Sequence, residues 1–295
     1  MEMTPSIEIK NLIKKFKGFE LNVPELVIPE GFATALIGEN GAGKSTLLRI
    51  LAGIRLDYKG EVSYFGGETD EIMIRENVGY TGPGNYFMPH WSIEQIGEVS
   101  ELLYDQFDKK RYVELCSELD VKTPEGAKKK DKQFHNLSDG MKMKVTLASV
   151  FARDTKMLLL DEPASPLDPL MRDKLCSMLR AYIDEREDHT VFFSTHNIAD
   201  MENVTDYAII MEQGKIVEQG FVEDLKDKYI LVKGEKQDLD ILENVLINCQ
   251  SNAYGFEGLC LAEQAEMLAG LDVSKERPTL SQISIAVMKQ YSKLG

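Results

Sequence analysis

The sequence predicts an α/β fold with a parallel core sheet, a small antiparallel β part in front of it and a short α+β extension behind. Two apolar, β-favouring runs, KMLLLD (156–161) and HTVFFST (189–195), are separated by a helical stretch, which is typical of parallel strands joined by helical crossovers. The run GFATALI (31–37) precedes a glycine-rich loop and the helical TLLRILAG, so it predicts strand, loop and helix. In front, IEIKNLIKKF (7–16) and GFELNVPEL (18–26) alternate apolar and polar residues, as half-buried antiparallel strands do.

The middle of the chain is helical and charged. SIEQIGEVSELLYDQF and KKRYVELCSEL are two candidate helices separated by Asp108, and we expect a helical subdomain at about 86–153. The charged AKKKDK (127–132) is interpreted as a solvated loop. At 295 residues the chain is long for one compact core, so one large domain and a small appendage are expected.

The character of the sequence changes after about Leu225. YILVKG and FEGLCLA resemble short strands around an amphipathic helix, and PTLSQISIAVMKQY predicts a closing helix that starts near Pro278. We therefore divide the chain into a main domain, 1–226, and a small C-terminal accessory domain, 227–295. Packing or homodimer support is the favoured role of the accessory domain, and a regulatory ligand site is the alternative.

Charge and cysteine content exclude several classes of protein. With 34 basic and 49 acidic residues the net charge is −15, the wrong sign for binding nucleic acid by counterion release. The four cysteines, Cys116, Cys176, Cys249 and Cys260, are too far apart for a C-x-x-C motif and are interpreted as reduced. No basic, apolar secretion signal opens the sequence and no apolar run approaches the roughly 18 residues of a membrane span. We expect a cytoplasmic chain that depends on another protein if it acts at a membrane.

The strongest chemical signal is GENGAGKS, from Gly38 to Ser45. It satisfies G-x-x-x-x-G-K-[ST] between a predicted strand and a predicted helix, which is the context that this motif requires. Glycines let backbone N–H groups surround phosphate oxygens, Lys44 neutralises the β and γ phosphates, and Ser45 can hold Mg²⁺. The loop predicts a nucleotide-binding site.

Two further strand ends carry polar residues. In LLLDEP (158–163), a carboxylate at the tip of a buried strand is costly unless it faces a cation or a donor. Asp161 is therefore a candidate Mg²⁺ ligand and Glu162 a candidate general base, with an ordinary acidic turn as the alternative. In FFSTHN, His196 follows the strand expected beside that one, where it can contact the γ-phosphate and orient a water molecule.

The segment LSDGMKMKV (137–145) places a serine, an aspartate and a glycine before a helical run. Ser138 alone is explained by helix capping, since a side-chain oxygen accepts a free N–H of the first turn. The same free N–H groups and the helix dipole also stabilise an anion. The residues themselves leave both interpretations open.

From about residue 5 to 225 the chain resembles an ATP-binding cassette, the P-loop NTPase subunit of ABC transporters. The resemblance rests on GENGAGKST, LSDGM, LLLDEP, ASPLD (164–168) and STHN, which occur in the order and spacing of that family. P-loop GTPases and kinases lack this order, and a translation-factor type would need a second cassette. The resemblance implies ATP hydrolysis with Mg²⁺ by two cassettes in a head-to-tail dimer, either a homodimer or a paralogous heterodimer. It also implies a separate multi-spanning permease that holds the chain at the cytoplasmic face of the membrane, without nucleic acid.

The resemblance also assigns residues. Glu162 and His196 are expected to be catalytic, Ser45 and Asp161 to bind the metal, and Asp168 to contact the partner cassette. Ser138, Asp139 and Gly140 are expected to bind ATP held by the partner. The nucleotide-binding residues are expected to be Phe16, Gly38, Asn40, Gly41, Ala42, Gly43, Lys44, Ser45 and Thr46. Phe16 matches the aromatic residue that stacks on adenine, with simple packing as the alternative.

The sequence departs from the family pattern at several positions. Asp139 replaces the usual glycine and Met141 the usual glutamine, and a carboxylate near a triphosphate weakens binding unless it points outward. Thr81, Gly82 and Pro83 stand where a glutamine usually binds Mg²⁺ and senses the permease. Pro166 is an unusual residue that is expected to stiffen its loop.

A narrower resemblance concerns LSDGMKMK, HWSIEQ and YILVKGE, which are similar to bacterial exporter ATPases that work with type-2 permeases. Some of these move antibiotics or peptide toxins. The resemblance therefore implies an exporter motor; the alternative is a soluble ABC-type ATPase with a regulatory, non-transport role.

Overall fold

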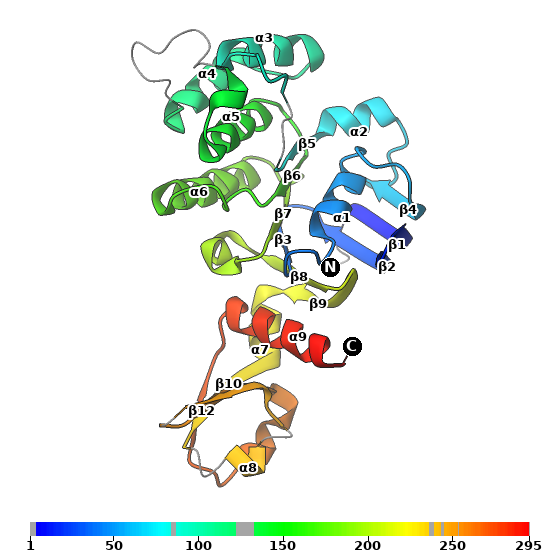
Figure 1. Ribbon diagram of the computed structural model, residues 1–295. Coiled ribbons are helices and arrows are strands. Elements are labelled where there is room, and N and C mark those ends of the chain that lie inside the picture. Colours follow the sequence, from blue (N-terminus) through cyan, green and yellow to red (C-terminus); the bar gives the residue numbers. More distant parts are fainter. Residues whose placement is uncertain are drawn as a thin grey trace.

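The computed structural model describes residues 4–83, 87–121, 133–235, 239–242, 245–252 and 254–294. Its strands form three sheets, with the orders β2-β1-β4, β5-β6-β7-β3-β8-β9 and β11-β12-β10-β13. The six-stranded sheet runs through the middle of the molecule (Figure 1). The small antiparallel sheet lies on one side of it, three helices lie at one end, and the C-terminal sheet lies at the other end.

The central sheet is parallel except at one edge. Its strands are β3 (Ala33–Ile37), β5 (Val78–Thr81), β6 (Met157–Asp161), β7 (Thr190–Thr195), β8 (Tyr207–Glu212) and β9 (Lys215–Phe221). Strand β9 pairs antiparallel with β8 through a tight turn at Gln213 and Gly214, which both have positive φ. The parallel strands predicted at 31–37, 156–161 and 189–195 are present as β3, β6 and β7, whereas β8 and the half-buried β9 were not predicted.

Helices cover this sheet and connect its strands. They are α1 (Lys44–Leu51), α2 (Glu71–Asn77), α6 (Pro169–Glu185) and α7 (Val222–Lys228). All residues of β3, β6, β7 and β8 are buried, which explains their continuous apolar sequences. Because the strands are parallel, the residues that follow β3, β6 and β7 meet at one edge of the sheet.

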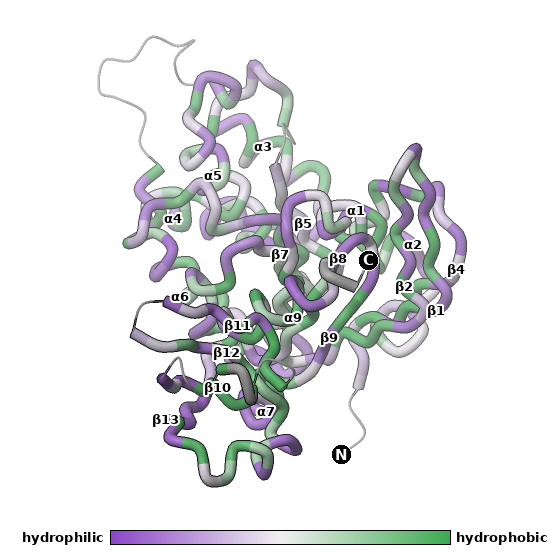
Figure 2. The backbone as a smooth tube through the Cα atoms, turned by 60° about the horizontal axis from the view of Figure 1, so that its bottom comes forward, coloured by the Kyte–Doolittle hydropathy of each residue, from purple (hydrophilic) through white to green (hydrophobic). Residues whose placement is uncertain are grey.

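The antiparallel sheet consists of β1 (Pro5–Phe16), β2 (Phe19–Pro29) and β4 (Lys59–Tyr64). Hydrophobic and hydrophilic stretches alternate along these strands (Figure 2), because one face packs on the core and the other is exposed. The strands expected at 7–16 and 18–26 are present, and β4 was not predicted.

Three helices form the helical part: α3 (Ile93–Leu103), α4 (Lys109–Glu118) and α5 (Asp139–Phe151). Ser92 and Gln95 make a capping box at the start of α3, and Asp108 caps α4. The first of the two predicted helices is shorter than its sequence pattern, because the backbone becomes extended at Tyr104. The AKKKDK segment lies outside the described residues.

The C-terminal region contains β10 (Tyr229–Gly234), α8 (Leu239–Leu242), β11 (Ile247–Ser251), β12 (Phe256–Leu261), β13 (Val273–Glu276) and α9 (Leu280–Leu294). An amphipathic helix was expected between the strands at YILVKG and FEGLCLA, and its predicted length is wrong. The described part of that segment contains the four-residue helix α8 and the strand β11. The predicted domain boundary at 226/227 falls within α7.

Helix α9 connects the C-terminal region to the main domain. In Figure 1 it lies between the central sheet and the C-terminal sheet. Leu280, Ile283, Ala286 and Val287 are buried in the same core cluster as the central strands, and Glu202 Oε1 accepts a hydrogen bond from Leu280 N at 3.0 Å. The sheet strands beyond it have a smaller core of their own, around Phe256.

Candidate nucleotide-binding site

The glycine-rich loop follows β3 and leads into α1. Gly41 and Gly43 have φ values of 90° and 108°, in the left-handed region that favours glycine. Gly43 is the N-cap of α1, and no side chain of the described residues caps this helix. The free N–H groups of the first turn therefore remain available to an anion.

Lys44 lies inside the loop. Its side chain is only 6% exposed, and Nζ donates to Gly38 O at 2.7 Å and to Glu39 O at 3.1 Å. The same atom is 3.4 Å from Glu162 Oε1. The ammonium group is therefore held at the junction of the loop and the end of β6. The predicted loop residues Gly38, Asn40, Gly41, Ala42, Gly43, Lys44, Ser45 and Thr46 occupy this loop and the first turn of α1.

Asp161 and Ser45 meet at the edge of the sheet. Ser45 Oγ donates to Asp161 Oδ1 at 3.0 Å, although the two residues are 116 positions apart. Asp161 is fully buried, and its Oδ2 has no hydrogen-bond partner among the residues that the structure describes. Burying an unpaired carboxylate oxygen is costly, and a hard divalent cation with oxygen ligands would compensate that cost. The two residues fit a Mg²⁺ ion.

Glu162 has an unusual backbone conformation. Its φ is 53°, a left-handed conformation that costs a non-glycine residue about 1–2 kcal/mol. Its Oε2 lies 2.7 Å from Nδ1 of His196, which is the side chain that follows β7. The predicted pair Glu162 and His196 is thus in direct contact, and Lys44 approaches the other carboxylate oxygen.

Ser194 is a site residue that the sequence analysis missed. It lies in β7, is fully buried, and contacts both Asp161 and the backbone of Glu162. In the sequence, Ser194 is a polar residue near the C-terminal end of the apolar run HTVFFST. Buried strands often contain a serine, so the role of Ser194 could be recognised only from its contacts with the residues that end β6.

The segment around Ser138 begins α5. Ser138 is the N-cap and accepts a hydrogen bond from Met141 N at 3.3 Å, so the expectation that Ser138 caps the helix is confirmed. The Asp139 side chain is 91% exposed and lies 3.6 Å from Lys142 Nζ, and therefore points outward. Among the described residues, no hydrogen bond or ion pair joins Ser138, Asp139 or Gly140 to the glycine-rich loop, Asp161 or Glu162.

Gly140 instead approaches the ASPLD loop of the same chain. A Cβ at this position would lie 2.7 Å from Pro166 O, which explains why only glycine fits. Asp168 ends the ASPLD loop as the N-cap of α6 and accepts from Met171 N at 3.1 Å. The ASPLD loop and the start of α5 are therefore packed together.

Phe16 and Thr81 are two further positions that the sequence pattern singles out. Phe16 ends β1 with 39% of its surface exposed, and Lys14 and Arg55 both lie over its ring at 5.1 and 5.2 Å. Thr81, which stands where the family usually has a glutamine region, is fully buried and donates to Met143 Sδ at 3.8 Å. Its side chain therefore points into the core and not at the metal position.

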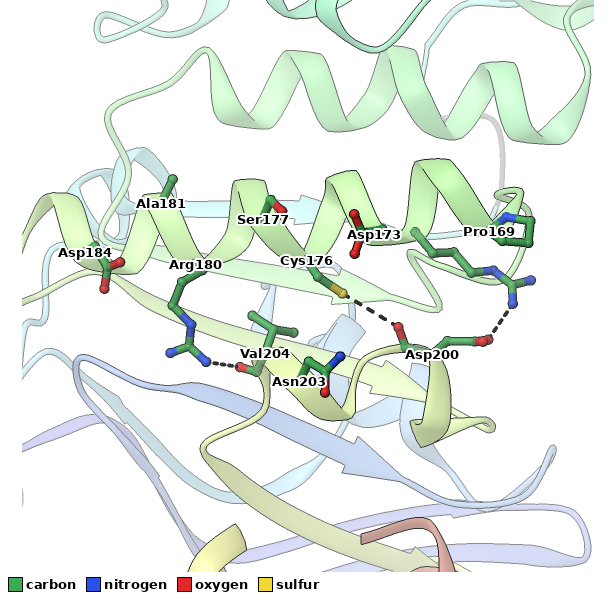
Figure 3. Close-up of a pocket in the computed structure, with 11 residues that line it drawn as sticks. Pro169, Asp173, Cys176, Ser177, Arg180, Ala181, Asp184, Asp200, Asn203 and Val204 are labelled. Atoms are coloured by element: carbon green, nitrogen blue, oxygen red, sulfur yellow. Dashed lines mark hydrogen bonds and ion pairs between the residues drawn. The ribbon is translucent and has the colours of Figure 1, made fainter. Parts of the chain in front are cut away.

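A pocket of about 650 Å³ lies elsewhere, along α6. Figure 3 shows two side chains of α6 in contact with the opposite wall: Cys176 Sγ donates to Asp200 O, and Arg180 donates to Val204 O. Arg172 forms an ion pair with Asp200 at 2.8 Å. Because both arginines of the pocket are already paired, it is a poor phosphate site compared with the glycine-rich loop.

Similar proteins of known sequence support the interpretation of this site as a nucleotide-binding site. The family described as ABC transporter matches residues 21–165. The nickel import ATP-binding protein NikO of Rhodobacter capsulatus is 32% identical over 245 residues, covering 74% of this chain and 90% of that protein. An uncharacterized ABC transporter ATP-binding protein of a Nostoc species is 28% identical and covers 98% of this chain and 89% of that protein.

Comparison with solved structures shows the same fold. A structure described as the ATP binding subunit of an ABC transporter has a TM-score of 0.62 at 23% identity, covering 75% of this chain and 91% of that one. Among the described residues, no helix is both long and apolar enough to cross a membrane. The chain belongs to the ABC transporter family as an ATP-binding subunit, an ATPase in which ATP hydrolysis is coupled to transport.

Proposed function

We propose that this chain is the ATP-hydrolysing subunit of a bacterial ABC exporter. It binds Mg·ATP, pairs head-to-tail with a second cassette, and drives a separate multi-spanning permease from the cytoplasmic face of the membrane. The observation that carries the catalytic part is the cluster of Lys44, Asp161, Glu162 and His196 at one edge of the sheet, next to an uncapped helix N-terminus.

ATP binding begins at the glycine-rich loop. The triphosphate accepts hydrogen bonds from the free N–H groups of α1, and Lys44 turns from the carbonyls of Gly38 and Glu39 to the β and γ phosphates. This movement also separates Lys44 from Glu162 and leaves the carboxylate free to act on water. Ser45 and Asp161 are the residues that would hold Mg²⁺, which neutralises phosphate charge when it is bound. Phe16 supplies a stacking surface for adenine beside Arg55.

Hydrolysis uses the carboxylate of Glu162. Glu162 accepts a proton from a water molecule while the water oxygen bonds to the γ-phosphorus and the bond to the bridging β–γ oxygen breaks, giving ADP and phosphate. His196 donates from Nδ1 to Glu162 Oε2, which fixes the carboxylate and leaves Nε2 for the γ-phosphate. The left-handed backbone of Glu162 is a strained feature of the kind found at catalytic sites.

The start of α5 completes the site of the partner cassette. The Ser138 hydroxyl accepts from Met141 N, so its own hydrogen remains free to donate to a phosphate oxygen. The outward orientation of Asp139 removes its carboxylate from that contact. Because no hydrogen bond or ion pair among the described residues joins this segment to its own phosphate loop, a second chain is needed to use it, with Asp168 beside the interface.

The test of this mechanism is Glu162→Gln, with Glu185→Gln, an exposed residue of α6, as the control. We expect steady-state hydrolysis to fall about 100-fold or more. We also expect an ATP-dependent dimer to accumulate in analytical ultracentrifugation. Hydrolysis at the parental rate would show that Glu162 is not the base.

A groove between the sheet and the helical part is the proposed docking site of the permease. It has a volume of about 560 Å³ and is lined by Ile54, Leu56, Tyr80 and Phe87, among others. Leu56 is 74% exposed and its neighbour Ile54 is 56% exposed, so the two side chains together present an apolar surface at this groove. The groove borders residues 78–83, the segment that senses the permease in the family that this chain resembles.

Docking is tested with Leu56→Asp and the control Leu102→Asp, an exposed leucine of α3 outside the groove. The tagged chain is purified from native membranes in mild detergent, and co-purifying proteins are identified by mass spectrometry. We expect one multi-spanning protein at near-equal amount, reduced by Leu56→Asp alone, with ATP binding retained by both variants. If only soluble proteins co-purify, the proposal that the chain works with a permease is wrong.

The direction of transport requires its own experiment. Export is supported by the resemblance of LSDGMKMK, HWSIEQ and YILVKGE to exporter ATPases, whereas two relatives are named for import of nickel and of sulfate or thiosulfate. We expect a deletion strain to become more sensitive to peptide antibiotics, with resistance restored by the parental gene but not by Glu162→Gln. A growth defect on limiting nickel or sulfate, without a change in sensitivity, would assign the chain to import.

A further inference from the structure

Ser194 joins the two carboxylate residues that end β6. Its Oγ donates to Asp161 Oδ1 at 2.6 Å and accepts from Glu162 N at 3.0 Å. The contact follows from the sheet register, in which Asp161 and Ser194 lie directly beside each other on parallel strands. Ser194 is fully buried, so water does not compete for either hydrogen bond.

The hydroxyl has one hydrogen, and the geometry determines its use. Because the amide of Glu162 is a donor, Ser194 must accept there, and its single hydrogen goes to the carboxylate of Asp161. Asp161 Oδ1 also accepts from Ser45 Oγ, whereas Oδ2 has no hydrogen-bond partner in the described part of the chain. Two hydroxyls on one oxygen therefore orient the carboxylate and leave the other oxygen free for a cation.

The second hydrogen bond acts on the backbone of Glu162. This residue has a φ of 53°, which a glutamate does not prefer, and its amide is held by Ser194. The direction of the Glu162 side chain, toward Lys44 and His196, depends on that backbone conformation. One buried hydroxyl thus acts on the metal carboxylate and on the base together.

We propose that Ser194 is a positioning residue that fixes the free oxygen of Asp161 toward the metal and the carboxylate of Glu162 toward the attacking water. This inference rests on the proposed roles of Asp161 and Glu162, but it is independent of the permease and of the direction of transport. A hydroxyl that only satisfied its own burial would contribute to stability without affecting metal binding.

The test compares Ser194→Ala with Ser6→Ala in the full-length protein. Ser6 is a matched control because it is also a fully buried strand serine, and its Oγ lies 2.7 Å from Thr190 Oγ1, away from the phosphate loop. Ser194→Cys retains the size of the side chain with a weak donor, and serves if the alanine variant does not fold. The first readout is binding of Mn²⁺, in place of Mg²⁺, to the nucleotide-loaded protein by electron paramagnetic resonance.

We expect Ser194→Ala to weaken Mn²⁺ binding and to lower kcat by about 10- to 100-fold, as for other residues that orient a metal ligand. The KM for ATP and metal-free nucleotide binding change by less than about threefold, since the phosphate loop is intact. Ser194→Cys gives intermediate values. Unchanged Mn²⁺ affinity in Ser194→Ala, or equal losses in Ser6→Ala, would overturn the positioning role. If Glu162→Gln retains hydrolysis while Ser194→Ala weakens Mn²⁺ binding, the base assignment fails and the role toward Asp161 remains.

Discussion

Gly140 and Pro166 show how one atom limits the sequence at the start of α5. The Cβ that any other residue would add lies 2.7 Å from the Pro166 carbonyl oxygen, closer than van der Waals contact allows. Because the clash involves backbone, it cannot be relieved by rotating a side chain. The ASPLD loop or the start of α5 must move instead, and both are proposed to face the partner cassette.

We therefore predict that Gly140→Ala lowers the stability of the protein by about 1–3 kcal/mol. It should also lower kcat by about 100-fold through misplacement of the loop. Asp139→Ala is the neighbouring control: it removes only an exposed ion pair with Lys142, worth less than about 1 kcal/mol. Urea unfolding and steady-state ATPase rates measure the two effects, and equal behaviour of the two variants would contradict the steric argument.

Glu212 is a buried carboxyl group at the end of β8, outside the proposed catalytic cluster. Burial, together with repulsion by Glu39, raises its pKa above the ordinary value of 4.5, while Ser292 and Lys44 act in the opposite direction. A carboxyl whose pKa is raised in the folded state binds its proton more tightly there than in the unfolded chain. Its ionisation therefore lowers stability, starting as the pH rises past the unfolded pKa and complete above the folded pKa.

Glu212→Gln should consequently raise the Tm at pH 7 and leave it nearly unchanged at pH 4, where the parental carboxyl is mostly protonated. Calorimetry between these pH values gives the profile. Glu61→Gln, at an exposed position of β4, should show no such trend. A Tm difference that is independent of pH would mean that packing, and not ionisation, distinguishes the two side chains at position 212.

At the scale of elements, α9 belongs to the main domain although it follows the C-terminal sheet in sequence. Its buried face lies in the core cluster that contains β3, β6 and β7. Deleting residues 228–295 would therefore expose part of the cassette core as well as removing the accessory sheet. Such a deletion does not isolate the contribution of the C-terminal region to dimerisation, and single substitutions are needed.

Ile283 and Ile285 provide a matched pair on this helix. Ile283 is fully buried and Ile285 is 42% exposed. We predict that Ile283→Ala destabilises the protein by about 2–4 kcal/mol because it leaves a cavity. Ile285→Ala should cost less than about 1 kcal/mol. Denaturant unfolding followed by tryptophan fluorescence measures both, and similar losses would show that α9 does not pack on the main core in solution.

At the scale of the whole molecule, charge opposes pairing. Each chain carries a net charge of −15, so two copies repel each other unless nucleotide and metal offset that repulsion. We predict that raising the NaCl concentration from about 0.05 to 0.3 M strengthens the ATP-dependent dimer of Glu162→Gln, because the Debye length falls from about 14 to 6 Å. Sedimentation at several salt concentrations tests this; a weaker dimer at high salt would indicate that specific ion pairs dominate the interface.

Elements and motifs that depend on local residue patterns could be predicted from the amino-acid sequence. The continuous apolar, β-favouring runs of β3, β6 and β7 are typical of buried strands, and the G-x-x-x-x-G-K-[ST] loop between a strand and a helix predicts phosphate binding. Lys44, Asp161, Glu162 and His196 could therefore be named in advance, since residues that follow parallel strands meet at one edge. The less buried β4 and β9 give no strong periodicity and were missed, and β8 was missed as well although all of its residues are buried.

Contacts between residues that are distant in the sequence became visible in the folded chain alone. The pairing of Ser194 with Asp161 depends on the register between β6 and β7, and the approach of Gly140 to Pro166 depends on how α5 packs beside the ASPLD loop. The attachment of α9 to the main core likewise joins segments that are far apart in sequence. Such contacts follow from the packing of the whole chain, because strand register and helix position minimise the free energy of the complete core and leave no local pattern in any one segment.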